Sequence, residues 1–128
     1  MLVGFSTHHG WVTAASKWDR PPQRKQLRDG LPGSWENLFH QTGVDRFFLD
    51  LRRGCELAAL AQAQRLQRAV GVIYRPETER QSHYSYTRLA RQFDAMIHID
   101  GTSALEPLDK TATWNAHEQA PDTFPSGM

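Results

Sequence analysis

One short segment of the chain combines side chains that could carry out acid–base chemistry. Its sequence, RPETERQSHY, follows an apolar run and places Glu79 four residues before His83. If Pro76 opens a helical turn, those two side chains lie on one face of it. A carboxylate beside an imidazole fixes the tautomer of the ring and raises its basicity, as a general base requires. We take Glu79 and His83 as candidate catalytic residues; the alternative is a capped turn whose charges pair with neighbouring arginines.

Further polar side chains follow the predicted strands, where open α/β sheets usually bind ligands. His8 follows the first apolar segment, and Arg75 follows the run GVIY. We take both as candidate substrate-binding residues, on the condition that their strands are parallel and share one rim. His98 and Asp100 fall on the same face of the last predicted strand, a pattern more typical of a polar strand end than of a ligand pair.

The residues that could hold a metal or act as a nucleophile make weaker patterns. His8 and His9 are adjacent, so in a strand they point to opposite faces, and no third ligand follows at a familiar spacing. We therefore expect no metal and no cofactor. Ser6 in GFSTH lacks the second glycine and the following helix of a nucleophile elbow, so we do not expect it to attack an ester. Cys55 has no partner for a disulfide.

The elements that must position these residues can be read from local patterns. We expect strands at 2–6, 11–15, 45–51, 70–74 and 95–100, with a hairpin turn at 7–10 between the first two. We expect helices at 35–43, capped by Ser34, at 55–69 and at 89–94, and an exposed loop at 17–33.

Strands that alternate with helices predict an α/β fold with a small mixed or partly parallel sheet and flanking helices. Because the chain starts inside its first predicted strand, we expect an incomplete domain over residues 1–110. The polar segment at 111–128 is predicted to be a flexible tail.

Composition excludes several classes of function. A net charge of +1 over 128 residues is too small to indicate binding to nucleic acid. No apolar run approaches the roughly 20 residues of a membrane-spanning helix, and the first residues lack the basic start of a signal peptide. The sequence therefore predicts a cytoplasmic protein that binds neither nucleic acid nor membrane.

Several longer segments occur in an order that resembles the C-terminal end of the erythromycin esterase family. They are GFSTHHGWVTAASKWD, LPGSWENLFHQTG, RFFLDLR, RAVGVIYRPETERQSHY and QFDAMIHIDGTSALEPL, and together they cover most of residues 3–108. The resemblance implies an α/β core and hydrolysis of ester bonds. In the macrolide-inactivating members of the family, a histidine-activated water opens a lactone ring, so a small ester or lactone is the implied substrate.

The resemblance omits the part of the family that carries its principal catalytic histidines and acidic residues, which precede the segment GFSTHHG. It therefore implies that His8, Arg75, Glu79 and His83 line or support a cleft. We expect the chain to be inactive alone and to need a complementing N-terminal half or another copy of itself. The alternative is a non-catalytic remnant or a self-associating interaction module.

Overall fold

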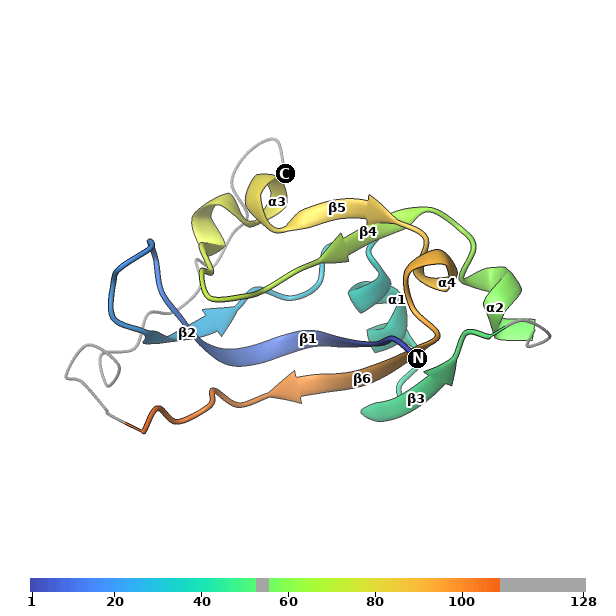
Figure 1. Cartoon of the computed structure of the whole chain (residues 1–128), viewed down its shortest axis with the longest axis horizontal. Helices are drawn as coiled ribbons and strands as arrows, with labels where there is room; N and C mark the ends of the chain where they lie inside the picture. The colour runs from blue at the N-terminus through green and yellow to red at the C-terminus, as the bar shows by residue number, and fades with distance from the viewer. Residues whose placement is uncertain (53–55, 109–128) are drawn as a thin grey trace. The chain divides into compact units, whose positions relative to one another are not determined.

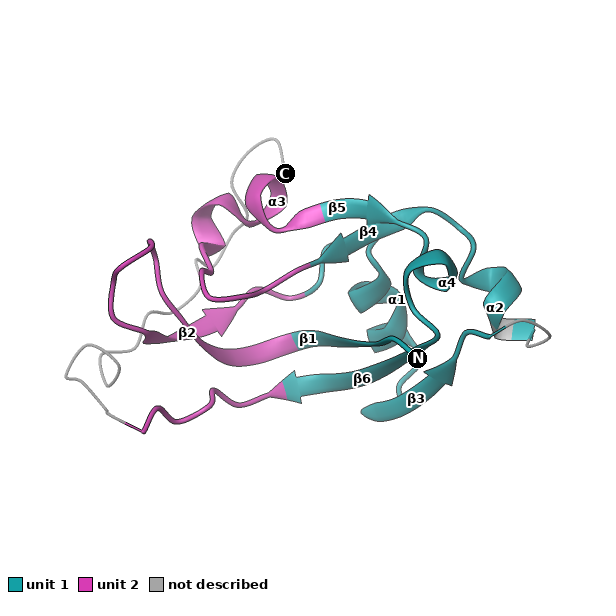
Figure 2. Ribbon diagram, in the orientation of Figure 1, with its two compact units in different colours: residues 1–8, 30–68, 85–101 teal, residues 9–29, 69–84, 102–128 magenta. Residues whose placement is uncertain are grey.

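The computed structural model describes residues 1–52 and 56–108 and divides into two compact units. Figure 2 colours the first unit, residues 1–8, 30–52, 56–68 and 85–101, teal, and the second unit, residues 9–29, 69–84 and 102–108, magenta. Each unit has its own hydrophobic cluster. Among the described residues, no helix has the length and apolar character needed to cross a membrane.

The secondary structure elements are short (Figure 1). In chain order they are β1 (Val3–Ala14), β2 (Gln23–Leu27), α1 (Trp35–Gln41), β3 (Arg46–Asp50), α2 (Glu56–Leu60), β4 (Arg65–Arg68), the 3₁₀ turn η1 (Pro76–Thr78), α3 (Glu79–Ser82), β5 (Tyr84–Thr87), α4 (Leu89–Gln92) and β6 (Ala95–Thr102).

The first unit is built on the strand order β1-β6-β3, with β6 in the middle. β1 and β6 run in the same direction (Figure 1), and the backbone N–H of Asp94 donates to the carbonyl of Leu2 where the two strands begin. β3 is antiparallel to β6, with Phe48 opposite Ile97. The predicted α/β class with a small, partly parallel sheet is therefore confirmed.

One face of this sheet is buried and polar at one end. Ser6 and His8 alternate along β1, and Met96, His98 and Asp100 alternate along β6, which is the period of a strand. Met96 lies in an apolar cluster with other buried side chains, which are Trp35, Phe39, Leu51, Ala61 and Leu89.

Helix α1 supplies much of that cluster and is confirmed where the sequence predicts it. The side chain of Ser34 accepts a hydrogen bond from the backbone N–H of Asn37 at 3.1 Å, which satisfies one of the free N–H groups at the helix start. Trp35 and Phe39, one turn apart, are both buried, while His40 follows at the edge of the same face.

The second unit pairs β2 with the latter half of β1 in antiparallel register, from Gly10 opposite Leu27 to Ala14 opposite Gln23. Ala14, Leu27 and Tyr74 form its apolar cluster. The backbone of Ile73 makes one parallel bridge to Ala15.

Several sequence-based predictions of elements are wrong. The expected hairpin at 7–10 does not form, because β1 continues as one strand from Val3 to Ala14. Gly10 permits this, since its φ of 121° lets the strand pass close to the backbone of Thr102. The expected loop at 17–33 contains β2, whose polar residues are stabilised by pairing with β1.

The region 55–69 departs from the helix that its composition favours. Within the described residues α2 ends at Leu60, and Arg65–Arg68 form β4, which pairs with β5, a strand the sequence reading missed. Cross-strand pairing outweighs helix propensity in this segment. The run 70–74, expected to be a buried strand, makes only a single bridge, and Val72 is 65% exposed. The predicted tail at 111–128 lies outside the described residues.

We expect Gly10→Ala to destabilise the protein by about 2 kcal/mol or more, because a Cβ there would collide with the carbonyl oxygen of Thr102 at a strained φ. Urea unfolding measures the change. Gly71→Ala is the matched control, because a Cβ at Gly71 meets no atom within 4 Å, and its effect should stay within about 0.5 kcal/mol. Equal effects of the two substitutions would contradict the close approach.

Candidate functional site

The polar end of the first unit's buried face collects ionisable side chains from three elements. Ser6 and His8 come from β1, His98 and Asp100 from β6, and His40 from the last turn of α1. The strand period places the β1 and β6 side chains on the face that α1 covers. Phe39 and Phe47 pack against the ring of His98 at centroid distances of 5.3 and 5.1 Å, so the site borders the apolar cluster.

A continuous chain of hydrogen bonds runs through the site. The Ser6 hydroxyl lies 2.8 Å from His98 Nδ1, and His98 Nε2 lies 3.0 Å from Asp100 Oδ1. The other carboxylate oxygen, Oδ2, lies 2.8 Å from His40 Nδ1. Asp100 therefore joins a buried imidazole to one near the surface.

Burial determines the state of the His98 ring. The side chain is 0% exposed, and this desolvation lowers its pKa, although the hydrogen bond and charge of Asp100 act in the opposite direction. A neutral ring that faces a carboxylate through Nε2 carries its proton there. Nδ1 is then the acceptor for the hydroxyl of Ser6.

The carboxyl group of Asp100 is held in its ionised form. Burial alone would raise its pKa, but the hydrogen bonds from His40 and His98 outweigh burial, and the net pKa is lowered. Asp100 thus accepts from both rings and fixes the tautomer of each. On His40 the nitrogen that meets the carboxylate is Nδ1.

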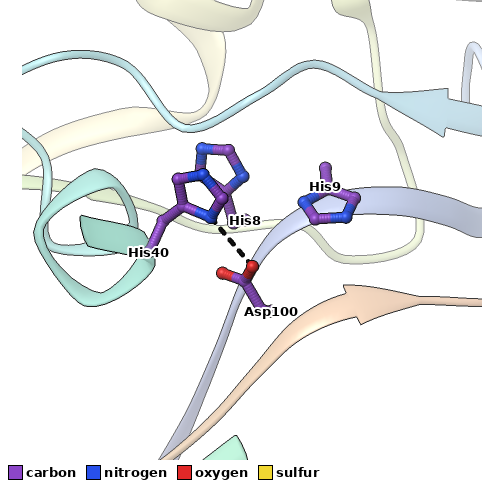
Figure 3. Close-up of side chains that lie close together, drawn as sticks. All are labelled: His8, His9, His40 and Asp100. Carbon is purple, nitrogen blue, oxygen red and sulfur yellow. Dashed lines mark hydrogen bonds and ion pairs between the residues drawn. The ribbon is translucent and has the colours of Figure 1, made fainter. Parts of the chain in front are cut away.

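His40 is the accessible end of this chain. Its side chain is 44% exposed, whereas that of Asp100 is 12% exposed. The ring stacks on His8 with a centroid distance of 3.7 Å and an angle of 3° between the planes (Figure 3). His8 itself is 4% exposed, so it forms a wall against which the His40 ring is held flat. Figure 3 also draws His9, the first residue of the second unit.

Arg68 holds the β1 backbone at the site in place. Its Nη2 donates to the carbonyls of Thr7 and His8, at 2.8 and 2.9 Å. Its own backbone N–H donates to Glu36 Oε1 at 2.8 Å, and Glu36 is 1% exposed in α1. Buried Glu36 and buried Arg68 therefore connect β4, α1 and β1. Glu36 lies one helical turn before His40.

The same side chains include donors that metals favour. One ligand atom from each of His8, His40 and Asp100 lies within 4.8 Å of the others. Imidazole and carboxylate suit zinc, whose tetrahedral ligand atoms lie about 3.3 Å apart at the usual bond lengths. His40 and Asp100 are hydrogen-bonded to each other, and the rings of His8 and His40 are stacked. A metal ion would therefore require these side chains to move. The arrangement fits a hydrogen-bonded dyad better than a preformed metal centre.

The residues singled out at 75–84 lie in the second unit. Pro76 opens the η1 turn, as predicted, and Glu79 begins α3. The Glu79 carboxylate is buried and accepts a hydrogen bond from the Tyr74 hydroxyl. His83 Nε2 accepts from the backbone N–H of Arg75 at 3.1 Å, and its Nδ1 lies 3.0 Å from the carbonyl of Ala69.

The structure thus separates the sequence-based candidates. Glu79 and His83 share one turn, where the His83 backbone N–H donates to the Glu79 carbonyl at 2.8 Å. Of the four candidates, only His8 belongs to the group around Asp100. His98 and Asp100, whose spacing is more typical of a polar strand end, are hydrogen-bonded to each other. His40 was missed; the signal was a histidine directly after Phe39, at the border of a predicted helix's apolar face.

Comparison with known protein families finds a match over most of the chain. The family model described as erythromycin esterase matches residues 1–102. A crystal structure of a protein from Bacillus cereus aligns with a TM-score of 0.64 and 22% identity over 79% of this chain. A crystal structure of a succinoglycan biosynthesis protein aligns with a TM-score of 0.63 and 24% identity, also over 79%. At such identities the two structures show a shared fold, and the chain spans 24% of the length of each.

We expect the stability of the protein to fall as the pH drops below about 6.5, in part through His98. Its folded pKa is below the ordinary value of 6.5, so the unfolded chain takes up the proton first and is favoured by acid. His98→Gln removes this titration. Melting temperatures at about pH 7.5 and about pH 5.5 should differ less in the variant than in the unaltered protein. An identical difference in both would contradict a buried neutral ring.

Proposed function

The chain belongs to the erythromycin esterase family, and we propose on that premise that it supplies the C-terminal part of a hydrolase that cleaves ester or lactone bonds with an activated water. The observation that carries the proposal is the bridge of Asp100 between His98 and His40. It orients the partly exposed imidazole of His40, and an imidazole whose Nδ1 meets a carboxylate can serve as a general base through Nε2.

In the proposed reaction, His40 Nε2 removes a proton from water as the oxygen attacks the carbonyl carbon. The ionised Asp100 stabilises the imidazolium that forms. The tetrahedral intermediate then collapses with cleavage of the bond between carbon and the leaving oxygen, and Nε2 returns the proton to that oxygen. The products are a carboxylic acid and an alcohol, joined in one molecule where the substrate is a lactone.

The remaining candidates support this chemistry in our proposal. His8 holds the ring of His40 by stacking and borders the place of the substrate. Glu79 and His83 orient the segment that carries Arg75 through their bonds to Tyr74 and to the backbone. That Arg75 contacts the substrate stays a prediction. No cofactor is required by these steps, and we propose that the protein acts in the cytoplasm.

The chain spans only 24% of the two solved structures that it resembles. An oxyanion is usually stabilised by donors placed at the developing charge, and such donors account for a large share of a hydrolase's rate. We propose that these donors, with further acid–base groups, come from the N-terminal part of the family. The isolated chain should therefore not turn over esters.

The test compares the chain alone with a hydrolase in which residues 1–108 are joined to or assembled with an N-terminal part of the family. With an aryl acetate as substrate, the chain alone should give the buffer rate. In the assembled enzyme, His40→Ala should lower kcat by about 10²-fold or more, because the base is lost. Arg46→Gln, on the exposed surface of β3, is the control and should leave kcat unchanged.

Two results would contradict the proposal. One is full turnover in the assembled enzyme carrying His40→Ala. The other is turnover by the chain alone that His83→Ala abolishes and His40→Ala does not, which would place the base in the segment at 75–84.

A second candidate function, a self-associating module, is favoured by the outer face of the first unit's sheet. Phe48 is 60% exposed on β3, and its cross-strand neighbour Ile97 is half-buried on β6. Phe5 points to the same outer face from β1 and is 68% exposed. Aromatic side chains this exposed on two strands that flank a third are typical of a covered surface.

Size-exclusion chromatography with light scattering tests this candidate. A module that associates through this face should give twice the 14.6 kDa of one chain or more, and Phe48→Ser should return it to one chain. Tyr86→Ser, at an exposed aromatic outside this sheet, is the matched control and should leave the mass unchanged. A protein that stays at 14.6 kDa at high concentration would exclude obligatory self-association.

A further inference from the structure

The second unit contains an open pocket of about 410 Å³, and the groups proposed to transfer the proton, His40 and Asp100, are not among the residues that line it. Its walls come from the end of β1 and from the turn that follows Ile73. They include Ser16, Lys17, Trp18, Arg75 and His83. A hollow of this size holds a small organic molecule rather than a single ion.

Among the described residues that line the pocket there is positive charge and no acid. Lys17 and Arg75 are among the lining residues, and no carboxylate is. A neighbouring hollow of about 420 Å³ shares Ser16 and Lys17 and adds Arg20, again without a carboxylate among its lining residues. Cations gathered on one concave surface attract an anion and raise its local concentration.

Arg75 is held in a position from which it can bind an anion. Its Nε donates to the carbonyl of Ser16 at 2.9 Å, and its backbone N–H donates to His83 Nε2 at 3.1 Å. These bonds restrain both ends of the residue and involve neither of its two Nη groups, which form a planar fork. Such a fork binds carboxylate or phosphate with two parallel hydrogen bonds, and a restrained fork loses less entropy on binding.

A buried ammonium lies behind the pocket wall. Lys25 is 1% exposed, and its Nζ donates to the Ser16 hydroxyl at 2.6 Å and to the Tyr74 carbonyl at 2.9 Å. The Ser16 hydroxyl in turn donates to Gln23 Oε1 at 3.4 Å, so both of these bonds stay within the protein. The positive charge of Lys25 behind the wall favours a negative group in the pocket.

Trp18 gives the pocket an apolar side. Its side chain is 74% exposed, an unusual state for the largest apolar residue, and it lines the hollow. An exposed indole beside paired cations offers a flat surface to the ring of a ligand while the cations hold its charge. These two features select for a ring compound with an acidic group.

We propose that this pocket binds a small ring compound bearing a carboxylate or a phosphate, with the acidic group on Arg75 and Lys17 and the ring against Trp18. This inference goes beyond the proposed hydrolysis and does not depend on it. Because binding is measured without turnover, a failure of the binding proposal would not contradict the proposed hydrolysis, and a failure of hydrolysis would not contradict binding.

The test is a calorimetric titration of the full chain with three probes of similar size: glucuronate, glucose 6-phosphate and glucose. We expect at least one of the two acidic probes to bind saturably and neutral glucose not to bind at the same concentrations. Preference for glucuronate assigns the site to carboxylates, and preference for glucose 6-phosphate assigns it to phosphates. Failure of both acidic probes, or equal binding of glucose, would overturn the proposal.

Variants assign the binding to this pocket. Lys17→Gln, at an exposed position, and Arg75→Gln should each weaken binding of the acidic probe about tenfold or more. Arg91→Gln, in the first unit, is the control for loss of one surface charge and should have no effect. Trp18→Leu should weaken binding of the ring compound and leave that of inorganic phosphate unchanged. Because Arg75→Gln removes a bond to Ser16, unchanged affinity in Lys17→Gln with an unchanged melting temperature is the decisive contrary result.

Discussion

An ionised carboxylate on a buried sheet face is costly unless its oxygens accept hydrogen bonds, and Asp100 meets that requirement with two imidazoles. The rest of the first unit's polar chemistry depends on this bridge. It settles the tautomers of His98 and His40, and through His98 it gives the Ser6 hydroxyl an acceptor. Without the carboxylate, His98 would be a buried ring with an unpaired nitrogen, in contact with Phe39 and Phe47.

The geometry of that bridge follows from ordinary secondary structure. Alternation along β6 places His98 and Asp100 on one face, and alternation along the parallel strand β1 places Ser6 and His8 beside them. Helix α1 brings His40 over the same face. The Glu36–Arg68 pair then fixes β1 against α1 through the carbonyls of Thr7 and His8. Buried polar groups of this kind favour one arrangement over its neighbours because any shift leaves a partner unsatisfied.

Local signals predicted a good part of the fold and little of the candidate site. The α1 helix, its Ser34 cap, the strand at 46–50 and the Pro76 turn all depend on near neighbours in the chain, and all were predicted. The segments 23–27 and 65–68 are polar and lack strand propensity, so only their partners make them strands. Local signals did not predict the site for a similar reason, because it depends on contacts between distant residues such as Ser6 and His98, which are 92 residues apart.

By itself, the sequence determined the family and fold class of this protein, because ordered motifs and alternating apolar segments can be recognised without knowing which residues are in contact. It also marked the segment at 75–84 as a turn with unusual polar content, which the structure places at a cationic pocket. Only the tertiary structure decided that Asp100 binds His40 as well as His98, and that His83 bonds to the backbone through both nitrogens. Spacing along a chain specifies which face a side chain occupies, whereas its partner depends on which other element packs against that face.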